Sequence, residues 1–413
     1  METKAPTFHR WAILIAACAL VFCTGTIYAF SVFRNDLADQ IGLSSTMTAY
    51  SINSALAPIP MILGGYFVDH RRSRAVALAG AMLYGVGWVL TAFGSTSGIA
   101  VILSYGVVAG LGQGLVYAAA LNNTLRFFPD RRGLASGLIT GANGGATIVM
   151  APLIQSLMSH SGLQTMMLVL GGVFLVIGVV AFLVIRQAPA DYAPEGWTPP
   201  AATVSAPAAV NVKWLQMLGT PMFWLIVVIF VCGAFSGVMI SGNASPIAQG
   251  MYLYEAAGAA VFVSVYSFSN LAGRIIWGTV SDRIGRVRAI QVIFLVAAVG
   301  LLIVMLGKGE HHAVPLVAGL LCIGTSFGGI MAIMPTLVMG QFGPANQGVN
   351  YGLVFAGYSI AALLSPRLGA SIGAANNGDF SLAFIIAVCA AALGICLAFV
   401  YQAVTRQRAK ISE

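Results

Sequence analysis

Long apolar runs alternate with short polar segments along most of this 413-residue chain. An α-helix needs about 20 predominantly apolar residues to cross a bilayer, and twelve runs reach that length. The pattern therefore predicts twelve membrane-spanning helices rather than the core of a soluble domain. The predicted spans are residues 11–33, 47–68, 75–94, 98–122, 133–158, 163–185, 221–243, 256–280, 288–307, 314–338, 350–371 and 380–402.

A proline-rich stretch separates the first six spans from the last six. Residues 186–216 contain five prolines and several alanines without helical periodicity, which is typical of an extended, flexible connection. We therefore expect an N-terminal half at 1–185, a cytoplasmic linker at 186–216 and a C-terminal half at 217–413.

The two halves also repeat each other. Residues 129–137 align with 344–352 at an offset of 215, and residues 65–72 align with 278–285 at an offset of 213. Two matches at nearly the same offset indicate a duplicated six-helix unit. The sequence thus predicts an all-α membrane protein of two six-helix halves, an architecture typical of rocking secondary transporters.

Composition and charge agree with this class. Hydrophobic residues make up 59% of the chain and charged residues only 8%, against about 25% charge in soluble domains. Sixteen of the 20 basic residues fall in loops on one side, so the positive-inside rule places both termini in the cytoplasm. The net charge of +8 is explained by topology, and we expect no nucleic-acid partner. The six cysteines lie in apolar runs without a spaced pair in a loop, so we expect neither a disulfide framework nor a metal site.

Arg274 is the only ionisable side chain near the middle of a predicted span. A charge at that depth costs roughly 2.5–3.5 kcal/mol on insertion scales and is usually retained for an ion, a substrate or a partner charge. Its planar guanidinium can donate two parallel hydrogen bonds to a carboxylate. Tyr266 and Asn270 precede it at helical spacing on the same face. This pattern favours a carrier of small organic anions.

Other polar residues inside spans are candidates for the same site. They are Tyr28, Tyr117 and Asn143, and each could instead form hydrogen bonds between helices. No aspartate, glutamate or histidine is central in a span, and Glu255 at the predicted outer mouth of the eighth is the nearest carboxylate. Glu255 could accept a coupling proton or simply favour the helix N-terminus. Proton symport and anion exchange therefore both remain open.

One loop motif resembles that of the major facilitator superfamily. Residues 278–286, with Asp282, Arg283 and Arg286, are similar to the family motif, while the earlier copy around Asp69 lacks its later glycine. The resemblance implies that these residues clamp neighbouring helices in one transport state and release them in the other. The alternative is a solvated, charge-rich turn.

A narrower resemblance covers nearly the whole chain. Residues 126–137, 350–352 and 273–278 are similar to the oxalate–formate antiporter family, which is close to the monocarboxylate transporters. The resemblance implies that Arg274 binds a substrate carboxylate, that Tyr28 and Tyr117 line the anion site, and that Phe327 and Phe355 enclose it. Two positions depart from the pattern: Tyr358 stands where oxalate carriers have a lysine, and Asn270 stands where animal monocarboxylate carriers have an aspartate.

These observations lead to one expected function. The chain should be a secondary active transporter of small monocarboxylates, resembling lactate or pyruvate, coupled to protons and working by alternating access. An organic-anion antiporter of the oxalate–formate type is the alternative, and a transporter-like sensor or channel is a further one. We expect a multi-pass monomer in the cell inner membrane, without enzymatic activity or cofactor, whose partners are the anion, a proton and the lipid bilayer.

Overall fold

Every regular element in the described residues is a helix; the computed structural model describes residues 9–189, 192–194 and 211–411. Ten helical segments in that part of the chain are long and apolar enough to cross a membrane. One of them, α8 (Arg132–Val184), contains two predicted spans, because Gly162 breaks its helical backbone with a φ of 77°. The helix α11 (Ala256–Ile284) supplies the remaining span. The fold is therefore the predicted all-α arrangement of twelve spans.

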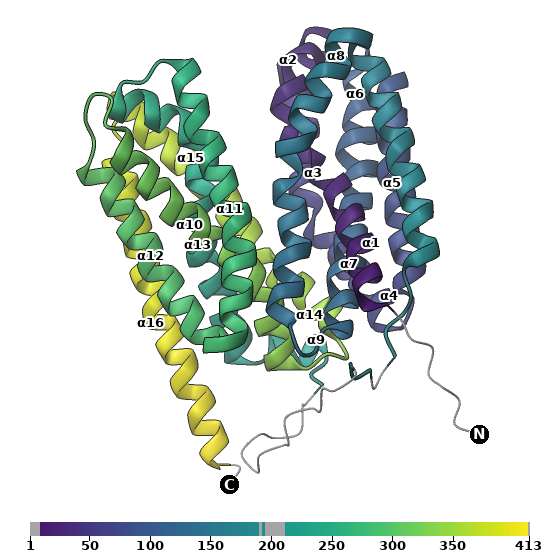
Figure 1. The fold of residues 1–413 in the computed structure, drawn as a ribbon, viewed down its shortest axis with the longest axis vertical. Helices are drawn as coiled ribbons and strands as arrows, with labels where there is room; N and C mark the ends of the chain where they lie inside the picture. Colours follow the sequence, from purple (N-terminus) through teal and green to yellow (C-terminus); the bar gives the residue numbers. More distant parts are fainter. Residues whose placement is uncertain (1–8, 190–191, 195–210, 412–413) are drawn as a thin grey trace. The chain divides into compact units, whose positions relative to one another are not determined.

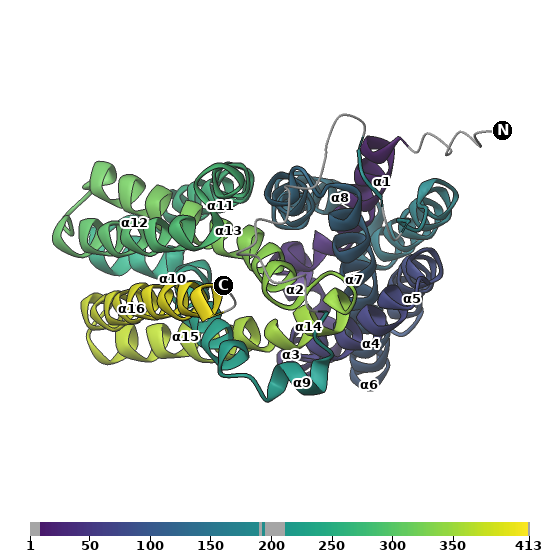
Figure 2. The same ribbon diagram turned by 90° about the horizontal axis from the view of Figure 1, so that it is seen from below.

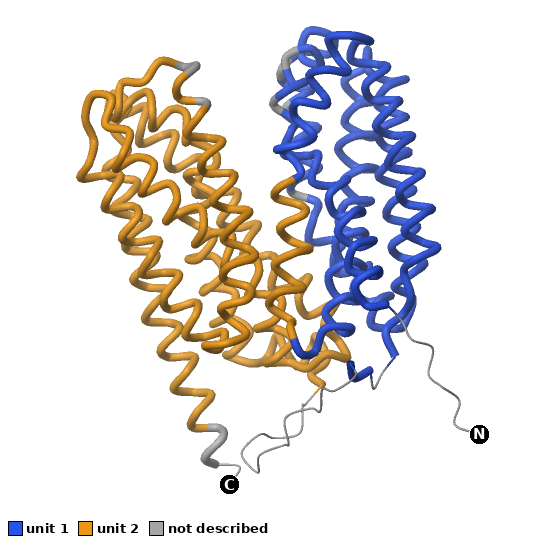
Figure 3. The backbone as a smooth tube through the Cα atoms, in the orientation of Figure 1, with its two compact units in different colours: residues 1–130, 146–197 blue, residues 131–145, 198–413 orange. Residues whose placement is uncertain are grey.

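The first compact unit comprises residues 1–130 and 146–197 (Figure 3). Its core is aromatic, with Phe33, Trp88 and Tyr105 almost fully buried. Its helices are α1 (Arg10–Thr24), η1 (Gly25–Ala29), α2 (Phe30–Ile41), α3 (Leu43–Leu56), α4 (Pro58–Asp69), α5 (Ser73–Phe93), α6 (Gly98–Val101), η2 (Ile102–Ala109), α7 (Gly110–Phe127) and most of α8.

Two spans of this unit are not regular α-helices. The first passes from α1 through the 3₁₀ turn η1 into α2, and the fourth passes from α6 through the π-helix η2 into α7. Such changes of winding disturb the regular i→i−4 hydrogen bonds and are frequent at functional positions. Asn53 Nδ2 donates to the carbonyl of Tyr105 within η2 at 2.7 Å, and the Tyr84 hydroxyl makes a contact of 3.4 Å to the carbonyl of Thr24, just before η1.

The second unit comprises residues 131–145 and 198–413, so it includes the first turns of α8. Figures 1 and 2 show its long helices side by side, with α11 against α13 and α16 against α12 and α15. Its other helices are α9 (Trp214–Leu218), α10 (Pro221–Tyr252), α12 (Arg286–Leu306), α13 (Ala313–Phe342), α14 (Gln347–Val354), α15 (Ala356–Ala375) and α16 (Ser381–Ile411). The sequence-based division into two halves and a linker stays a prediction.

The end of the predicted linker is attached to the second unit. The backbone N–H of Val212 donates to the carbonyl of Phe342 at 2.9 Å. The carbonyl of Val212 accepts from Asn346 Nδ2 at 3.2 Å and from Asn350 Nδ2 at 3.0 Å. These bonds hold the chain against the α13–α14 connection just before α9 begins at Trp214.

Glycines bring α8 and α11 into backbone contact. A Cβ atom at Gly133 would collide with the carbonyl oxygen of Gly278, and one at Gly278 would collide with that of Gly133. One turn further along, a Cβ atom at Gly137 would overlap the carbonyl of Arg274. Small residues at these positions let the two helix axes approach closely enough for the Arg274 region to meet α8.

Candidate substrate-binding site

The guanidinium of Arg274 is buried between α11 and the first turns of α8, with only 3% of the residue exposed. Its Nε donates to Asn270 Oδ1 at 2.9 Å, one turn earlier on the same helix. One terminal nitrogen donates to the carbonyl of Thr140 on α8. These two neutral acceptors orient the guanidinium but leave its positive charge uncompensated.

Glycine provides the space that the guanidinium occupies. A Cβ atom at Gly144 would lie 2.8 Å from Arg274 Cζ and 2.9 Å from one of its terminal nitrogens. At Gly328 of α13, a Cβ atom would lie 2.8 Å from the Arg274 backbone nitrogen. The lack of side chains at both positions therefore allows Arg274 to reach its acceptors.

Ion pairs in the described residues join other charges and leave Arg274 without an acidic partner. A buried, unpaired charge is unfavourable, so such a site attracts an anion that can take the missing role. The geometry suits a carboxylate, because the guanidinium presents several donors in one plane. Asn143 lies on α8 three residues after Thr140 and is also buried.

Three of the predicted aromatic residues form one cluster in the second unit. The Tyr358 ring lies 4.9 Å from that of Phe355 and 6.4 Å, nearly parallel, from that of Phe327. Phe230 on α10 completes the group, with centroids 6.0 Å from Phe355 and 6.2 Å from Tyr358. The sequence analysis missed Phe230, because it lies in a continuous apolar run and carries no polar atom.

Tyr266, Asn270 and Arg274 were predicted to share one face of α11, and Tyr266 uses its hydroxyl to bind a neighbouring helix. The Tyr266 hydroxyl donates to the carbonyl of Gly237 on α10 at 2.5 Å. A Cβ atom at Gly237 would in turn collide with the Phe327 side chain. Tyr266 therefore links α11 to the helix that supports the aromatic cluster.

The predicted residues of the first unit differ from each other in exposure. Tyr28 lies in η1 and is 42% exposed, whereas Tyr117 on α7 is 7% exposed. Tyr28 and Tyr117 belong to a different unit from Arg274. Their roles in anion binding stay predictions.

Asp282 holds the N-terminus of α8. Its Oδ1 accepts the backbone N–H of Gly133 at 2.9 Å, and its Oδ2 accepts that of Leu134 at 3.2 Å. A carboxylate at this place satisfies unpaired amide groups of the first helical turn and interacts favourably with the helix dipole. Arg283 is exposed at the end of α11. The Arg286 guanidinium packs against α13, where a Cβ atom at Gly340 would collide with it.

The earlier copy of the motif makes a different bond. Asp69 at the end of α4 pairs with Arg126 at the end of α7 at 2.7 Å, and its side chain is only 3% exposed. Nearby, Arg10 makes two contacts to Asp130, at 2.6 and 3.1 Å. Asp69 thus joins α4 to α7, and Asp130 joins the start of α1 to the turn between α7 and α8.

Glu255 is the N-cap residue of α11 and is exposed to solvent. Its side chain makes no capping hydrogen bond, so any contribution to the helix end is through its charge alone. The structure places it at the start of the same helix that carries Arg274 near its middle.

A polytopic helical fold of two units is the arrangement of a membrane transporter. The sequence model of the Major Facilitator Superfamily matches residues 12–366 and 256–413, and the chain belongs to this family.

Curated relatives of the chain include transporters with named substrates. The chain is 29% identical over 359 residues to the Escherichia coli protein named uncharacterized MFS-type transporter YhjX, covering 86% of each. It is 29% identical over 396 residues to the oxalate:formate antiporter of Oxalobacter formigenes, covering 94% of this chain and 91% of the relative. It is 26% identical over 402 residues to human monocarboxylate transporter 11, covering 93% and 82%.

Solved structures support the same fold. The chain matches the Escherichia coli fucose:proton symporter FucP with a TM-score of 0.72 and 14% identity, covering 94% of this chain and 98% of that one. It matches a bacterial homologue of ferroportin with a TM-score of 0.70 and 14% identity, covering 95% and 99%. At these identities the likeness concerns the fold.

Proposed function

We propose that the protein is a secondary active transporter of small monocarboxylates such as lactate or pyruvate, coupled to protons and working by alternating access. The observation that carries this proposal is the buried Arg274 guanidinium, which has neutral acceptors but no acidic partner in the described residues. A substrate carboxylate would supply the missing negative charge. The relatives with named substrates act on oxalate, formate or monocarboxylates, which supports an anionic cargo.

The number of cations favours a monoanion over oxalate. Tyr358, at the position where oxalate carriers have a lysine, packs in an aromatic cluster with Phe327 and Phe355. A second carboxylate directed toward these rings would lose its hydration without gaining a cation, which is costly. The site residues we propose are Arg274, Asn270, Asn143, Tyr28, Tyr117, Phe327, Phe355 and Tyr358.

Anion exchange of the oxalate–formate type is the second candidate. It is favoured by Asn270, because the asparagine that binds Arg274 Nε cannot take up a proton as an aspartate could. Exchange of one anion for another needs no titrating side chain.

Uptake into proteoliposomes tests the proposal. Purified protein would be reconstituted, and labelled lactate, pyruvate, formate and oxalate supplied with an inward proton gradient, with internal unlabelled anion, or with neither. We expect accumulation of monocarboxylates driven by the gradient. Uptake that requires internal anion would favour exchange, whereas oxalate affinity above that of every monocarboxylate would contradict the selectivity argument. Saturable binding without flux would identify a sensor.

Gly144→Ala is expected to weaken anion affinity by about tenfold, equivalent to about 1.4 kcal/mol. The added methyl group would lie 2.8 Å from Arg274 Cζ and force the guanidinium from its place. Because the flexible end of a side chain can move, we expect normal folding and expression. The measurement is KM for uptake, with Gly141→Ala as the matched control: on the same helix, its methyl group would meet the side chains of Leu271 at 3.3 Å and Ile275 at 3.8 Å, and not that of Arg274. Equal KM values in both variants would remove Gly144 from the site.

Glu255→Gln tests the proposed proton acceptor. If Glu255 cycles its proton with each turnover, the variant should lose accumulation driven by the proton gradient and retain exchange between identical anions. Exchange is spared because it does not require return of the empty carrier. Both fluxes can be measured in the same vesicles. Gradient-driven accumulation at the native level would show that Glu255 only contributes charge at the start of α11.

A further inference from the structure

The exposed side chains of α3 carry hydroxyl groups. Among the α3 side chains that the structure describes, the exposed ones are those of Ser44, Thr48, Ser51 and Ser54. They recur at intervals of four, three and three residues, which places them on one face of the helix. With both termini in the cytoplasm, as the basic loops predict, α3 forms the outer half of the second span. We call these four residues the hydroxyl face of α3.

The inner half of the same span has the opposite character. It is formed by α4, whose exposed side chains are aliphatic or aromatic: Ile59 at 56%, Leu63 at 53%, Tyr66 at 50% and Phe67 at 42%. A lipid environment presents apolar chains to both halves of a span and so would favour apolar side chains on both. The change of character between α3 and α4 therefore indicates that the hydroxyl face meets water.

Two of the hydroxyls already donate their protons within the helix. Thr48 Oγ1 donates to the carbonyl of Ser44 at 2.8 Å, and Ser54 Oγ donates to the carbonyl of Tyr50 at 3.0 Å. Each oxygen keeps lone pairs that accept hydrogen bonds from water but not from an anion. The hydroxyl face is therefore suited to hydration and does not retain an anion, as a surface that conducts a solute requires.

Charge does not retain an anion at the outer end of the hydroxyl face either. The helix α2, which packs against α3, exposes Arg34, Asp36 and Asp39. These side chains carry both signs and supply no net positive charge. An anion that reaches this end is therefore free to move on.

The inner end of the hydroxyl face lies beside Tyr28. The Tyr50 hydroxyl is close enough to the Ser54 side chain and to Tyr28 to interact electrostatically with both. The Tyr50 ring also stacks on that of Phe30, two residues after Tyr28, with centroids 4.6 Å apart. Tyr28 is 42% exposed, so its hydroxyl can meet a solute that arrives along α3.

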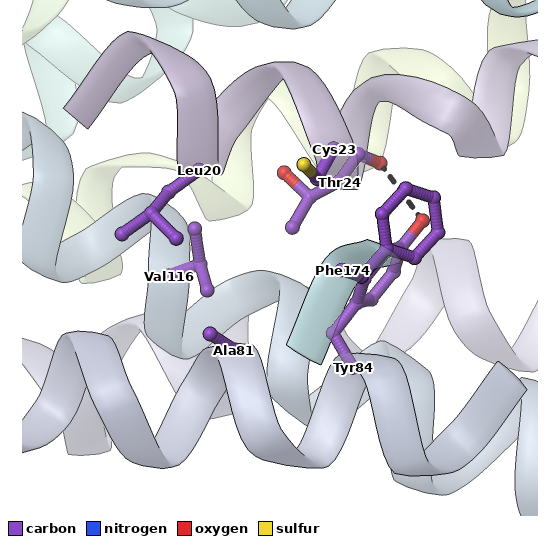
Figure 4. Close-up of a pocket in the computed structure, with 7 residues that line it drawn as sticks. All are labelled: Leu20, Cys23, Thr24, Ala81, Tyr84, Val116 and Phe174. Carbon is purple, nitrogen blue, oxygen red and sulfur yellow. Dashed lines mark hydrogen bonds between the residues drawn. The ribbon is translucent and has the colours of Figure 1, made fainter. Parts of the chain in front are cut away.

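The interior of the unit near Tyr28 offers no comparable space. The cavity in Figure 4, which Thr24 lines one turn before Tyr28, has a volume of about 10 Å³, close to the space that one water molecule needs. The rings of Tyr84 and Phe174, 5.3 Å apart, bound one side of it. A carboxylate with several heavy atoms does not fit there. The exposed side of the unit is therefore the route by which an anion can reach Tyr28.

We propose that the hydroxyl face of α3 is a hydrated wall along which the anion passes between the outer side of the membrane and Tyr28. This inference rests on the proposed function, because it takes the cargo to be a small organic anion. It adds the route within the first unit and assigns Ser44, Thr48, Ser51 and Ser54 to it.

Cysteine labelling tests whether the hydroxyl face meets water. A cysteine reacts as its thiolate, which forms in water and is suppressed in apolar surroundings. Ser51→Cys would be treated from the outer side with a membrane-impermeant sulfonated methanethiosulfonate, which is itself a small organic anion. The native protein, treated in the same way, reports any reaction of its six cysteines. We expect Ser51→Cys to be labelled, and Thr48→Cys, on the same face, repeats the test if Ser51→Cys does not reach the membrane.

Leu103→Cys is the matched control. Leu103 lies in η2, which packs against α3, and is 56% exposed. It is three residues before Gly106, where an added Cβ atom would meet Ala49 and Ile52, so Leu103 and Ser51 lie at similar depth. We expect no labelling of Leu103→Cys, because its side chain is apolar and suits lipid. Failure to label the α3 cysteines, or equal labelling of Leu103→Cys, would overturn the inference.

Uptake by the labelled protein separates the route from the proposed function. The sulfonate attached at Ser51→Cys should lower uptake of labelled lactate relative to the same variant before treatment, because it adds a negative charge to the route. A neutral methyl group, attached with methyl methanethiosulfonate, should lower it less. Unchanged uptake after complete labelling with the sulfonate would refute the route. Lack of uptake of every anion by the native protein would instead contradict the proposed function, while the labelling would still decide whether α3 meets water.

Discussion

Replacing Arg274 with lysine is expected to raise KM for the carried anion by roughly ten- to a hundredfold. Lysine keeps the positive charge but loses the planar fork that donates two parallel hydrogen bonds to a carboxylate. One charge-assisted hydrogen bond contributes about 1.5–3 kcal/mol, and each 1.4 kcal/mol corresponds to a tenfold change in affinity. The lysine would also lack the Nε donor that now binds Asn270 Oδ1. Initial rates of uptake over a range of substrate concentrations provide the measurement.

Tyr358→Phe is the control for this substitution. It removes a hydroxyl near the aromatic cluster while leaving the ring contacts to Phe327 and Phe355 in place, so we expect a smaller effect than that of Arg274→Lys. If Arg274→Lys transported with native rate and affinity, the two-point carboxylate contact would have to be abandoned.

Asp282→Asn is expected to lower maximal transport rate by about tenfold while changing KM by less than about twofold. The native carboxylate accepts two backbone N–H groups at the start of α8, at 2.9 and 3.2 Å. Because Asp282 is exposed to solvent, each of these bonds contributes about 0.5–1.5 kcal/mol, and asparagine loses the charge and one acceptor. The loss would destabilise the state with this contact closed relative to the state in which it is open, so the balance of the transport cycle changes. Maximal rate and KM would be measured separately for exchange of anions across the membrane (counterflow) and for net uptake.

Asp379→Asn separates this effect from the general loss of a carboxylate. Asp379 pairs with Lys308 at 2.7 Å, but its side chain is 41% exposed, and exposed ion pairs contribute little to stability. We expect nearly native transport from this variant. Native turnover in Asp282→Asn as well would mean that the contact to α8 is only a helix cap.

The spans were predictable because burial in a membrane imposes a strong apolar pattern. Even the separation of the fifth and sixth spans has a local cause, since Gly162 adopts a φ of 77° that favours glycine. The irregular segments η1 and η2 were not predicted. Side chains of other helices donate to the backbone at these places, Asn53 to the carbonyl of Tyr105 and Tyr84 to that of Thr24, and no local periodicity indicates such contacts.

In the candidate site, the sequence indicated which residues share a helix face, but not which groups on other helices they bind. The spacing of Asn270 and Arg274 placed them on one helix face, and they are indeed hydrogen bonded. The sequence could not show that Thr140 supplies the other acceptor, or that Asp282 accepts backbone amides of α8. Both contacts depend on how closely α8 approaches α11, which is a property of the tertiary packing.

That close approach has a mechanical consequence. Where Gly133, Gly137 and Gly278 meet, backbone faces backbone, and there are no long side chains locked between ridges. Side chains that interdigitate must leave their rotamers before two helices can slide, whereas a surface without side chains presents no such steps. The energy barrier to sliding α8 along α11 would therefore be low. The hydrogen bonds of Asp282 and Arg274 would define the positions in which the two helices rest.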